Sequence, residues 1–192
     1  MARTSVCVGF FRSLVQSATA RFEEAMRLVV LVGLPGSGKT TWAAWQPYSV
    51  LSSDAIRQLI ADDPTIQTIH RQVFGTLRSL ARQRLELRRP VTCIDSTALT
   101  RWERRPWLRL ADDADCEAEA IFFDTPLEIC LARNAHRDRV VPAEVVSDMA
   151  HRLEPPSINE GFARVITLRT AVFPTPAVPA ASAPPPPPES PA

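Results

Sequence analysis

The sequence is poor in lysine. Lys39 is the only lysine among 192 residues, and every other cationic side chain apart from histidine is an arginine. The chain also lacks a strong excess of either charge, since 22 basic and 21 acidic residues give a formal net charge of +1. A near-neutral chain argues against a large binding face for duplex DNA, which needs a basic surface. It does not exclude a site that holds only the end of a strand.

Long apolar runs are absent as well. No stretch approaches the roughly 18 apolar residues that a membrane-spanning helix requires, so we expect no membrane partner. The four cysteines, Cys7, Cys93, Cys116 and Cys130, show no spacing typical of a metal site. Together with the nucleotide-binding loop described below, they indicate reduced thiols in a cytoplasmic protein.

The two ends of the chain differ in composition from its middle. Residues 1–25 are interpreted as a loosely ordered extension, with a signal peptide as the minor alternative, because Met26 lies directly before the first strongly apolar run. Residues 171–192 contain half of the 18 prolines, five of them in succession. Such a tail cannot pack a core and is expected to be extended and disordered. We expect residues 26–170 to form a single domain.

Short apolar runs alternate with helical patterns through this middle part. The predicted strands are Arg27–Val32, Tyr48–Ser52, Val91–Asp95, Glu117–Phe123 and Arg164–Leu168. The predicted helices are Lys39–Trp45, Asp54–Ala61, Thr65–Arg88, Glu103–Ala111, Pro126–Asn134 and Pro142–Leu153. Continuous apolar strands that alternate with helices are typical of a parallel sheet covered on both faces. The pattern therefore predicts a three-layer α/β/α fold.

The most specific motif follows the first predicted strand and opens the next helix. Residues 33–40 read Gly-Leu-Pro-Gly-Ser-Gly-Lys-Thr, which fits the P-loop pattern G-x-x-x-x-G-K-[ST]. In this motif Lys39 bridges the β- and γ-phosphates of ATP, and the Thr40 hydroxyl ligates Mg²⁺. A compact ammonium fits between two phosphates better than a planar guanidinium, which explains lysine at this position. The loop residues predicted to bind ATP are Gly33, Pro35, Gly36, Ser37, Gly38, Lys39, Thr40 and Thr41.

Two acidic residues lie at the ends of predicted strands, at the edge where open α/β sheets bind ligands. Asp95 could hold Mg²⁺ through water, or it could cap the following turn with Ser96 and Thr97. Asp54 could accept a proton from an attacking hydroxyl, with Arg57 binding a phosphate. The alternative is a helix-capping aspartate beside a surface arginine, and the spacing alone favours that alternative.

Arginine is concentrated in two segments. Residues 133–139, which include Arg133, Arg137 and Arg139, follow the helix after the fourth strand. They resemble the lid of nucleotide kinases, although a solvated polar turn is also possible. The longest predicted helix and its end carry Arg71, Arg78, Arg82, Arg84, Arg88 and Arg89. Such a set is more typical of a solvated surface than of nucleic-acid contact.

Taken together, these residues resemble the 5′-hydroxyl polynucleotide kinase family, especially the kinase domain of bacterial RNA-repair enzymes. The resemblance spans roughly residues 26–168. It rests on Gly33–Thr40, Leu51–Asp54 with Arg57, Cys93–Thr97, Arg104-Arg105, Phe122–Pro126, Arg133-Asn134 with Arg137, and Gly161-Phe162. It implies a P-loop NTPase fold with an arginine-bearing lid over residues 26–170. It also implies an enzyme that uses ATP and Mg²⁺ and acts on 5′-hydroxyl ends of nucleic acids.

The resemblance further implies a role for each site residue. Asp54 is the general base, Arg57 contacts an acceptor phosphate or stabilises the acceptor site, and Arg137 binds the donor phosphates with Arg133 in support. Lys39, Asp54 and Arg137 form the catalytic set, and Thr40 with Asp95 forms the metal site.

Three departures from the family pattern are visible. Ala98 stands where the family often has asparagine, and the lid turn is one residue shorter, so Arg137 and Arg139 compete for one role. We expect no phosphatase or ligase domain within these residues, so a role in repair would need partners. Two other functions remain open: a small-molecule kinase, and a non-catalytic ATP-binding module whose proline-rich tail binds a partner.

Overall fold

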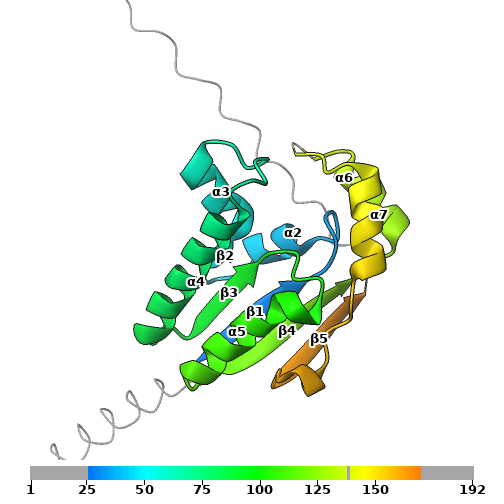
Figure 1. Ribbon diagram of the computed structural model, residues 1–192. Coiled ribbons are helices and arrows are strands. Elements are labelled where there is room, and N and C mark those ends of the chain that lie inside the picture. Colours follow the sequence, from blue (N-terminus) through cyan, green and yellow to red (C-terminus); the bar gives the residue numbers. More distant parts are fainter. Residues whose placement is uncertain (1–25, 138, 170–192) are drawn as a thin grey trace, which may run out of the picture.

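Five parallel strands form the centre of the molecule. The protein is represented by a computed structural model, which describes residues 26–137 and 139–169 (Figure 1). The strands are β1 (Arg27–Val32), β2 (Val50–Ser52), β3 (Val91–Asp95), β4 (Glu117–Asp124) and β5 (Arg164–Arg169), in the order β2-β3-β1-β4-β5. All neighbouring pairs run parallel. The predicted N-terminal extension (1–25) and proline-rich tail (171–192) lie outside the described residues.

Helices cover both faces of this sheet. They are α2 (Lys39–Ala44), α3 (Ser53–Ala61), α4 (His70–Glu86), α5 (Arg101–Asp113), α6 (Leu127–Asn134) and α7 (Ala143–Arg152), followed by a 3₁₀ helix at Ile158–Glu160. Alternate side chains of a strand point to opposite faces. In β1, Leu28 and Val30 pack against α4 and α5, whereas Val29 and Leu31 pack against α2. The three-layer α/β/α prediction is confirmed.

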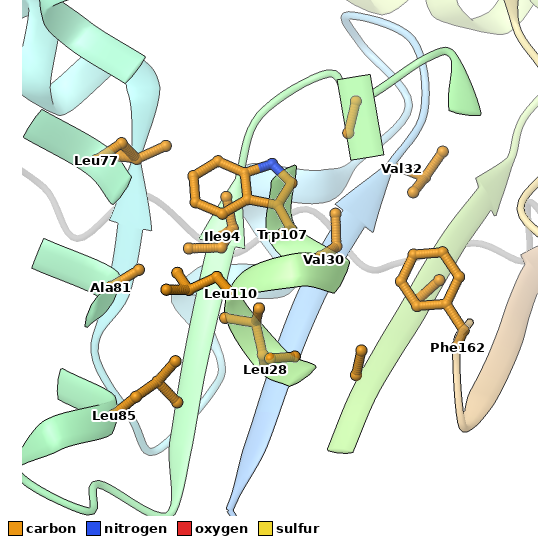
Figure 2. Packing of buried hydrophobic residues seen from close by; sticks show 14 of the residues in the cluster. Leu28, Val30, Val32, Leu77, Ala81, Leu85, Ile94, Trp107, Leu110 and Phe162 are labelled. Atoms are coloured by element: carbon orange, nitrogen blue, oxygen red, sulfur yellow. The ribbon is translucent and has the colours of Figure 1, made fainter. Parts of the chain in front are cut away.

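The larger core lies between the sheet and the pair α4 and α5. Figure 2 shows Leu77 and Leu85 of α4 and Trp107 and Leu110 of α5 directed toward the sheet around Ile94. Trp107 is 1% exposed, and burial of one such side chain contributes about 1.5–3 kcal/mol. This packing fixes α4 and α5 relative to the carboxyl ends of β1 and β3, where the candidate site lies.

The prediction that the longest helix begins at Thr65 is wrong, because α4 begins at His70. The Asp63 carboxylate accepts hydrogen bonds from both the backbone N–H and the hydroxyl of Thr65, each at 2.7 Å. Aspartate side chains that bond to the backbone two residues later stabilise turns in place of helix. Pro64 within this turn also lacks a backbone N–H. Residues 62–69 therefore form a separate connection that borders the site.

Two expectations from composition can be compared with the structure. None of the helices in the described ranges is both long and apolar enough to cross a membrane.

Cys93, Cys116 and Cys130 are free thiols, and burial raises the pKa of Cys93 to about 12. Such a thiol stays protonated at neutral pH, so Cys93 contributes packing to the core and has no reactive thiolate.

Candidate active site

The phosphate-binding loop is held in place by its neighbours. Gly36 adopts φ +80° and lies so close to α6 that a Cβ atom there would be 2.3 Å from the carbonyl oxygen of Cys130. Only glycine fits this position. The Thr125 hydroxyl donates to the carbonyl of Ser37 at 3.2 Å, which ties the loop to the end of β4. The loop thus takes its shape from contacts with β4 and α6.

The single lysine lies at the centre of this loop. The Lys39 ammonium donates to the carbonyl oxygens of Gly33 and Leu34, both at 2.7 Å, and the side chain is buried. Burial lowers the pKa of Lys39 to about 8; the charge of Asp95 opposes this shift and that of Arg137 adds to it. The ammonium is therefore a partly desolvated charge whose ionisation depends on nearby anions.

This lowered pKa predicts that affinity for a triphosphate falls as the pH rises through about 8. Lys39 binds phosphate as an ammonium, so above its pKa a proton must be regained before binding. We expect the dissociation constant of a fluorescent ATP analogue to be flat below about pH 7 and to approach a tenfold rise per pH unit well above 8. AMP, which has no β- or γ-phosphate, should show no such break. An ATP affinity that stays constant to about pH 9.5 would contradict the assignment.

Thr40 and Asp95 form an oxygen pair next to the lysine. The Thr40 hydroxyl donates to Asp95 Oδ2 at 3.0 Å. Asp95 ends β3 and is buried, and this burial raises its pKa while Lys39 and Thr40 oppose the shift. The Asp95 carboxylate thus faces Thr40, and the metal role of this pair stays a prediction. A hydroxyl and a carboxylate fit the oxygen-rich coordination of Mg²⁺.

Asp54 lies at the start of α3 and does not cap it. The N-cap is Ser52, whose hydroxyl accepts the backbone N–H of Ala55 at 3.4 Å. The Asp54 carboxylate instead accepts hydrogen bonds from two guanidinium groups, at 2.8 Å from Arg57 and at 2.5 Å from Arg139. The interpretation of Asp54 as an ordinary cap is therefore wrong. Its carboxylate lies in the cavity that also contains Lys39.

The lid arginines have separate positions. Arg137 and Arg139 both line the cavity from the segment between α6 and α7, but Arg139 pairs with Asp54. The charge of Arg137 lowers the pKa of Lys39, after the larger effects of burial and Asp95. Arg133, in the last turn of α6, does not line this cavity. Arg139 is thus the lid arginine that contacts Asp54, and the assignment of Arg137 to the donor phosphates stays a prediction.

Asn134 joins the two ends of the connection between α6 and α7 by hydrogen bonds to Val141. The sequence did not predict this contact. The Asn134 side-chain amide donates to the carbonyl of Val141 at 2.7 Å and its amide oxygen accepts the N–H of Val141 at 3.2 Å. The residue is buried. This two-way bond joins the two ends of the arginine segment, so that Arg137 and Arg139 project from a closed loop. An asparagine at a helix end beside an arginine cluster was the only available signal.

The cavity that unites these groups has a volume of about 970 Å³. It lies at the carboxyl ends of β1 and β3, and its lining residues come from the phosphate loop, from α3 and α4, from α5, and from α7 with the segment before it. Figure 1 shows α3 and α4 on the opposite side of the molecule from α7. The described residues that line it include seven cations, Lys39, Arg57, Arg71, Arg78, Arg137, Arg139 and Arg152, and three carboxylates, Asp54, Asp95 and Glu103. Because the whole chain has a net charge of +1, positive charge is concentrated here. The cavity suits an anionic ligand larger than the triphosphate end alone.

Two lining arginines come from the set that the sequence indicated to be surface. Arg71 and Arg78 face the cavity from α4. Arg82, on the same helix, lines a different and smaller pocket, and Arg84 donates to the carbonyl of Val91. Arg71 and Arg78 are seven residues apart and therefore share one helix face, but sequence alone could not show that this face borders the site.

One family model and several known proteins match this chain in sequence. A family model described as an AAA domain matches residues 28–156. An L-seryl-tRNA(Sec) kinase of Methanococcus maripaludis is 26% identical over 141 residues, which are 67% of this chain and 53% of the relative. A bifunctional polynucleotide phosphatase/kinase of Schizosaccharomyces pombe is 23% identical over 151 residues, which are 74% of this chain and 33% of the relative. The chain therefore spans about half and one third of the lengths of these two relatives.

A solved structure of the Pnkp1/Rnl/Hen1 RNA repair complex shares the fold. The likeness has a TM-score of 0.59 and 17% sequence identity, and it covers 67% of this chain and 44% of that chain. At this identity the likeness extends to the fold alone.

Proposed function

The chain belongs to the AAA domain family, and from this premise we propose that it is a kinase that transfers the γ-phosphate of ATP to the 5′-hydroxyl end of a polynucleotide. One observation carries the proposal. A carboxylate held by two guanidinium groups, Asp54, shares a single cavity with a phosphate-loop lysine and with the Thr40–Asp95 pair. Nucleotide binding alone does not require a carboxylate placed to activate a hydroxyl.

The donor side consists of the loop and the residues around it. Backbone N–H groups of the loop and the Lys39 ammonium bind the β- and γ-phosphates. Thr40 and Asp95 would hold Mg²⁺, which neutralises charge on the phosphates when it is bound. Arg137, on the same side, adds a donor for the negative charge of the transferring group. The loop and these side chains position the γ-phosphate toward Asp54.

The acceptor side depends on Asp54. Both guanidinium bonds are made to its Oδ1 atom, and no described residue donates to Oδ2. Oδ2 is therefore open to an acceptor hydroxyl. In the proposed reaction Asp54 accepts the hydroxyl proton, the hydroxyl oxygen bonds to the γ-phosphorus, and the bond from this phosphorus to the bridging oxygen of ADP breaks. Arg57 and Arg139 orient the carboxylate for this proton transfer.

A nucleic-acid end as acceptor is supported by the charge of the cavity and by the named relatives. The excess of arginine in the cavity favours an acceptor that carries phosphates. The two curated relatives named above are kinases of a tRNA-borne group and of polynucleotides. Each of these observations points to an acceptor that is attached to, or part of, a nucleic acid.

The test is transfer of labelled γ-phosphate from ATP to a 5′-hydroxyl oligonucleotide, set beside a panel of small hydroxyl metabolites. We expect labelling of the oligonucleotide, with a KM for this acceptor that rises with salt, since phosphate contacts release counterions. The KM for ATP serves as the control for a general salt effect. Labelling confined to a small metabolite would contradict the proposed acceptor and leave the kinase assignment in place.

A small hydroxyl compound is the second candidate acceptor. Val145 and Met149 of α7 and Pro106 of α5 contribute apolar side chains to the lining. The cavity volume also falls in the range of small-molecule sites. This candidate predicts an acceptor KM that salt barely changes.

A further inference from the structure

The part of the cavity wall formed by α4 combines two rings and two cations. His70, Arg71, Phe74 and Arg78 all line the cavity, and we call these four residues the α4 face. The rings of His70 and Phe74 lie with their centroids 4.4 Å apart and tilted by 35°. Their positions in the helix place all four near one side of it. The α4 face borders the same cavity as Asp54.

Most of the α4 face lies outside the core. Val73, Leu77, Ala81 and Leu85 are the α4 residues that fill the core, and each is almost fully buried. Phe74 is only half-buried, whereas His70 and Arg71 are exposed. Phe74 packs against the edge of the core and leaves part of its ring accessible, and an accessible aromatic ring can stack on a ligand.

The two arginines of the α4 face differ from the other arginines that line the cavity. Arg71 and Arg78 form no ion pair with any residue in the described ranges. By contrast, Arg57, Arg139 and Arg152 of the same cavity are each paired with a carboxylate. Exposed guanidinium groups beside an aromatic ring are a combination that single-stranded nucleic acids bind, through phosphate pairing and base stacking. The charge on the α4 face is thus available for a ligand.

We propose that the α4 face binds the terminal nucleotides of the acceptor strand, with a nucleobase stacked on Phe74 and its flanking phosphates paired with Arg71 and Arg78. This proposal rests on the function proposed above and adds the part of the acceptor that is recognised. Arg71 and Arg78 are seven residues apart, about 10.5 Å along the helix axis. That spacing favours two separate phosphates, so the acceptor is an oligonucleotide and not a mononucleotide or a sugar. Because every base has a stacking face, the α4 face should discriminate little among sequences.

The test is a binding cycle that varies the protein and the acceptor together. The acceptor is a short single-stranded oligonucleotide with a 5′-hydroxyl, either intact or with its first two nucleotides abasic. Its dissociation constant is measured by fluorescence anisotropy with a non-hydrolysable ATP analogue present, for wild type, Phe74→Leu and Phe74→Tyr. Leucine preserves apolar packing against the core but removes the ring, and tyrosine keeps the ring. Arg71→Gln and Arg78→Gln are compared with Arg82→Gln, an equal change on the same helix outside the cavity.

We expect Phe74→Leu to weaken binding of the intact strand about tenfold and to leave binding of the abasic strand nearly unchanged. Phe74→Tyr should bind like wild type, and Arg71→Gln and Arg78→Gln should each lower the salt dependence of binding by about one phosphate contact. Arg82→Gln should change neither the affinity for the strand nor the salt dependence of binding. Equal effects of Phe74→Leu on both strands, or no effect on either, would overturn the stacking proposal.

Phosphate transfer measured on the same oligonucleotides separates this proposal from the proposed function. If wild type transfers phosphate equally well to intact and abasic strands, the kinase assignment stands and the proposal for the α4 face is overturned. Binding that depends on Phe74 and on the base, without transfer, supports the α4 face and overturns the kinase assignment. Neither binding nor transfer overturns both.

Discussion

Replacement of Asp54 with Asn is expected to slow phosphate transfer by about 10²–10⁴-fold while changing ATP affinity by less than about threefold. Asparagine keeps the Oδ1 atom that accepts from Arg57 and Arg139, so the local geometry should survive. It cannot take up the proton of the acceptor hydroxyl at neutral pH. Single-turnover transfer rates and the dissociation constant of an ATP analogue, measured on the same preparation, give the two numbers.

Asp62→Asn is the matched control for this variant. Asp62 ends the same helix, α3, in the left-handed conformation that asparagine also tolerates, and it does not line the cavity. It should transfer phosphate at the wild-type rate. If Asp54→Asn kept full activity, the assignment of Asp54 as the base would be wrong. If Asp54→Asn lowered ATP affinity as much as the transfer rate, the substitution would act through ATP binding and not through the acceptor hydroxyl.

Loss of Arg104 should have the largest effect on stability, about 3–5 kcal/mol for Arg104→Met. Arg104 is fully buried in α5 and makes two bonds of 2.8 Å to the Glu160 carboxylate, which is itself buried. It also donates to the carbonyl oxygens of Ala98, Leu99 and Glu154. Methionine would leave the Glu160 charge buried without its partner. Thermal unfolding should show a fall in midpoint of roughly 10–20 °C.

Two comparisons isolate the ion pair from simple loss of a side chain. Arg109→Met makes the same change at an exposed position of α5 and should leave stability within about 0.5 kcal/mol of wild type. The double variant Arg104→Met with Glu160→Met should lose less free energy of unfolding than the two single variants lose together. The reason is that it leaves neither charge alone in the core. Additive losses would indicate that the two charges are independent of each other.

The fold could be predicted from the sequence because each strand and helix is specified by the pattern of residues within its own short segment. The run Arg27–Val32 is almost wholly apolar and the run Val91–Asp95 is mostly so, and all five strands appear in the structure within about two residues of their predicted bounds. The start of α4 was mispredicted because the apolar spacing of Ile66 and Ile69 continues into the turn. The bonds from Thr65 to Asp63, which no periodicity shows, stop the helix there.

The candidate site was predictable only in part, because its partners are distant in the chain. Thr40 and Lys39 follow from a local motif, but the contact of Thr40 with Asp95 joins residues 55 positions apart. Asp54 and Arg139 are 85 positions apart, so spacing around Asp54 could not distinguish a base from a helix cap. The pairing of Arg104 with Glu160 is equally nonlocal. Arg71 and Arg78 of α4 are exposed, as the sequence predicts, but only the fold shows that they line the cavity.

The position of the transferred label tests the central claim most directly. In a single turnover with γ-labelled ATP and a 5′-hydroxyl oligonucleotide, we predict that the label becomes the 5′-terminal phosphate. An oligonucleotide that already carries a 5′-phosphate should acquire none. Release of the label only as inorganic phosphate, at a rate independent of the oligonucleotide, would contradict the proposal that Asp54 directs the γ-phosphate to a nucleic-acid end.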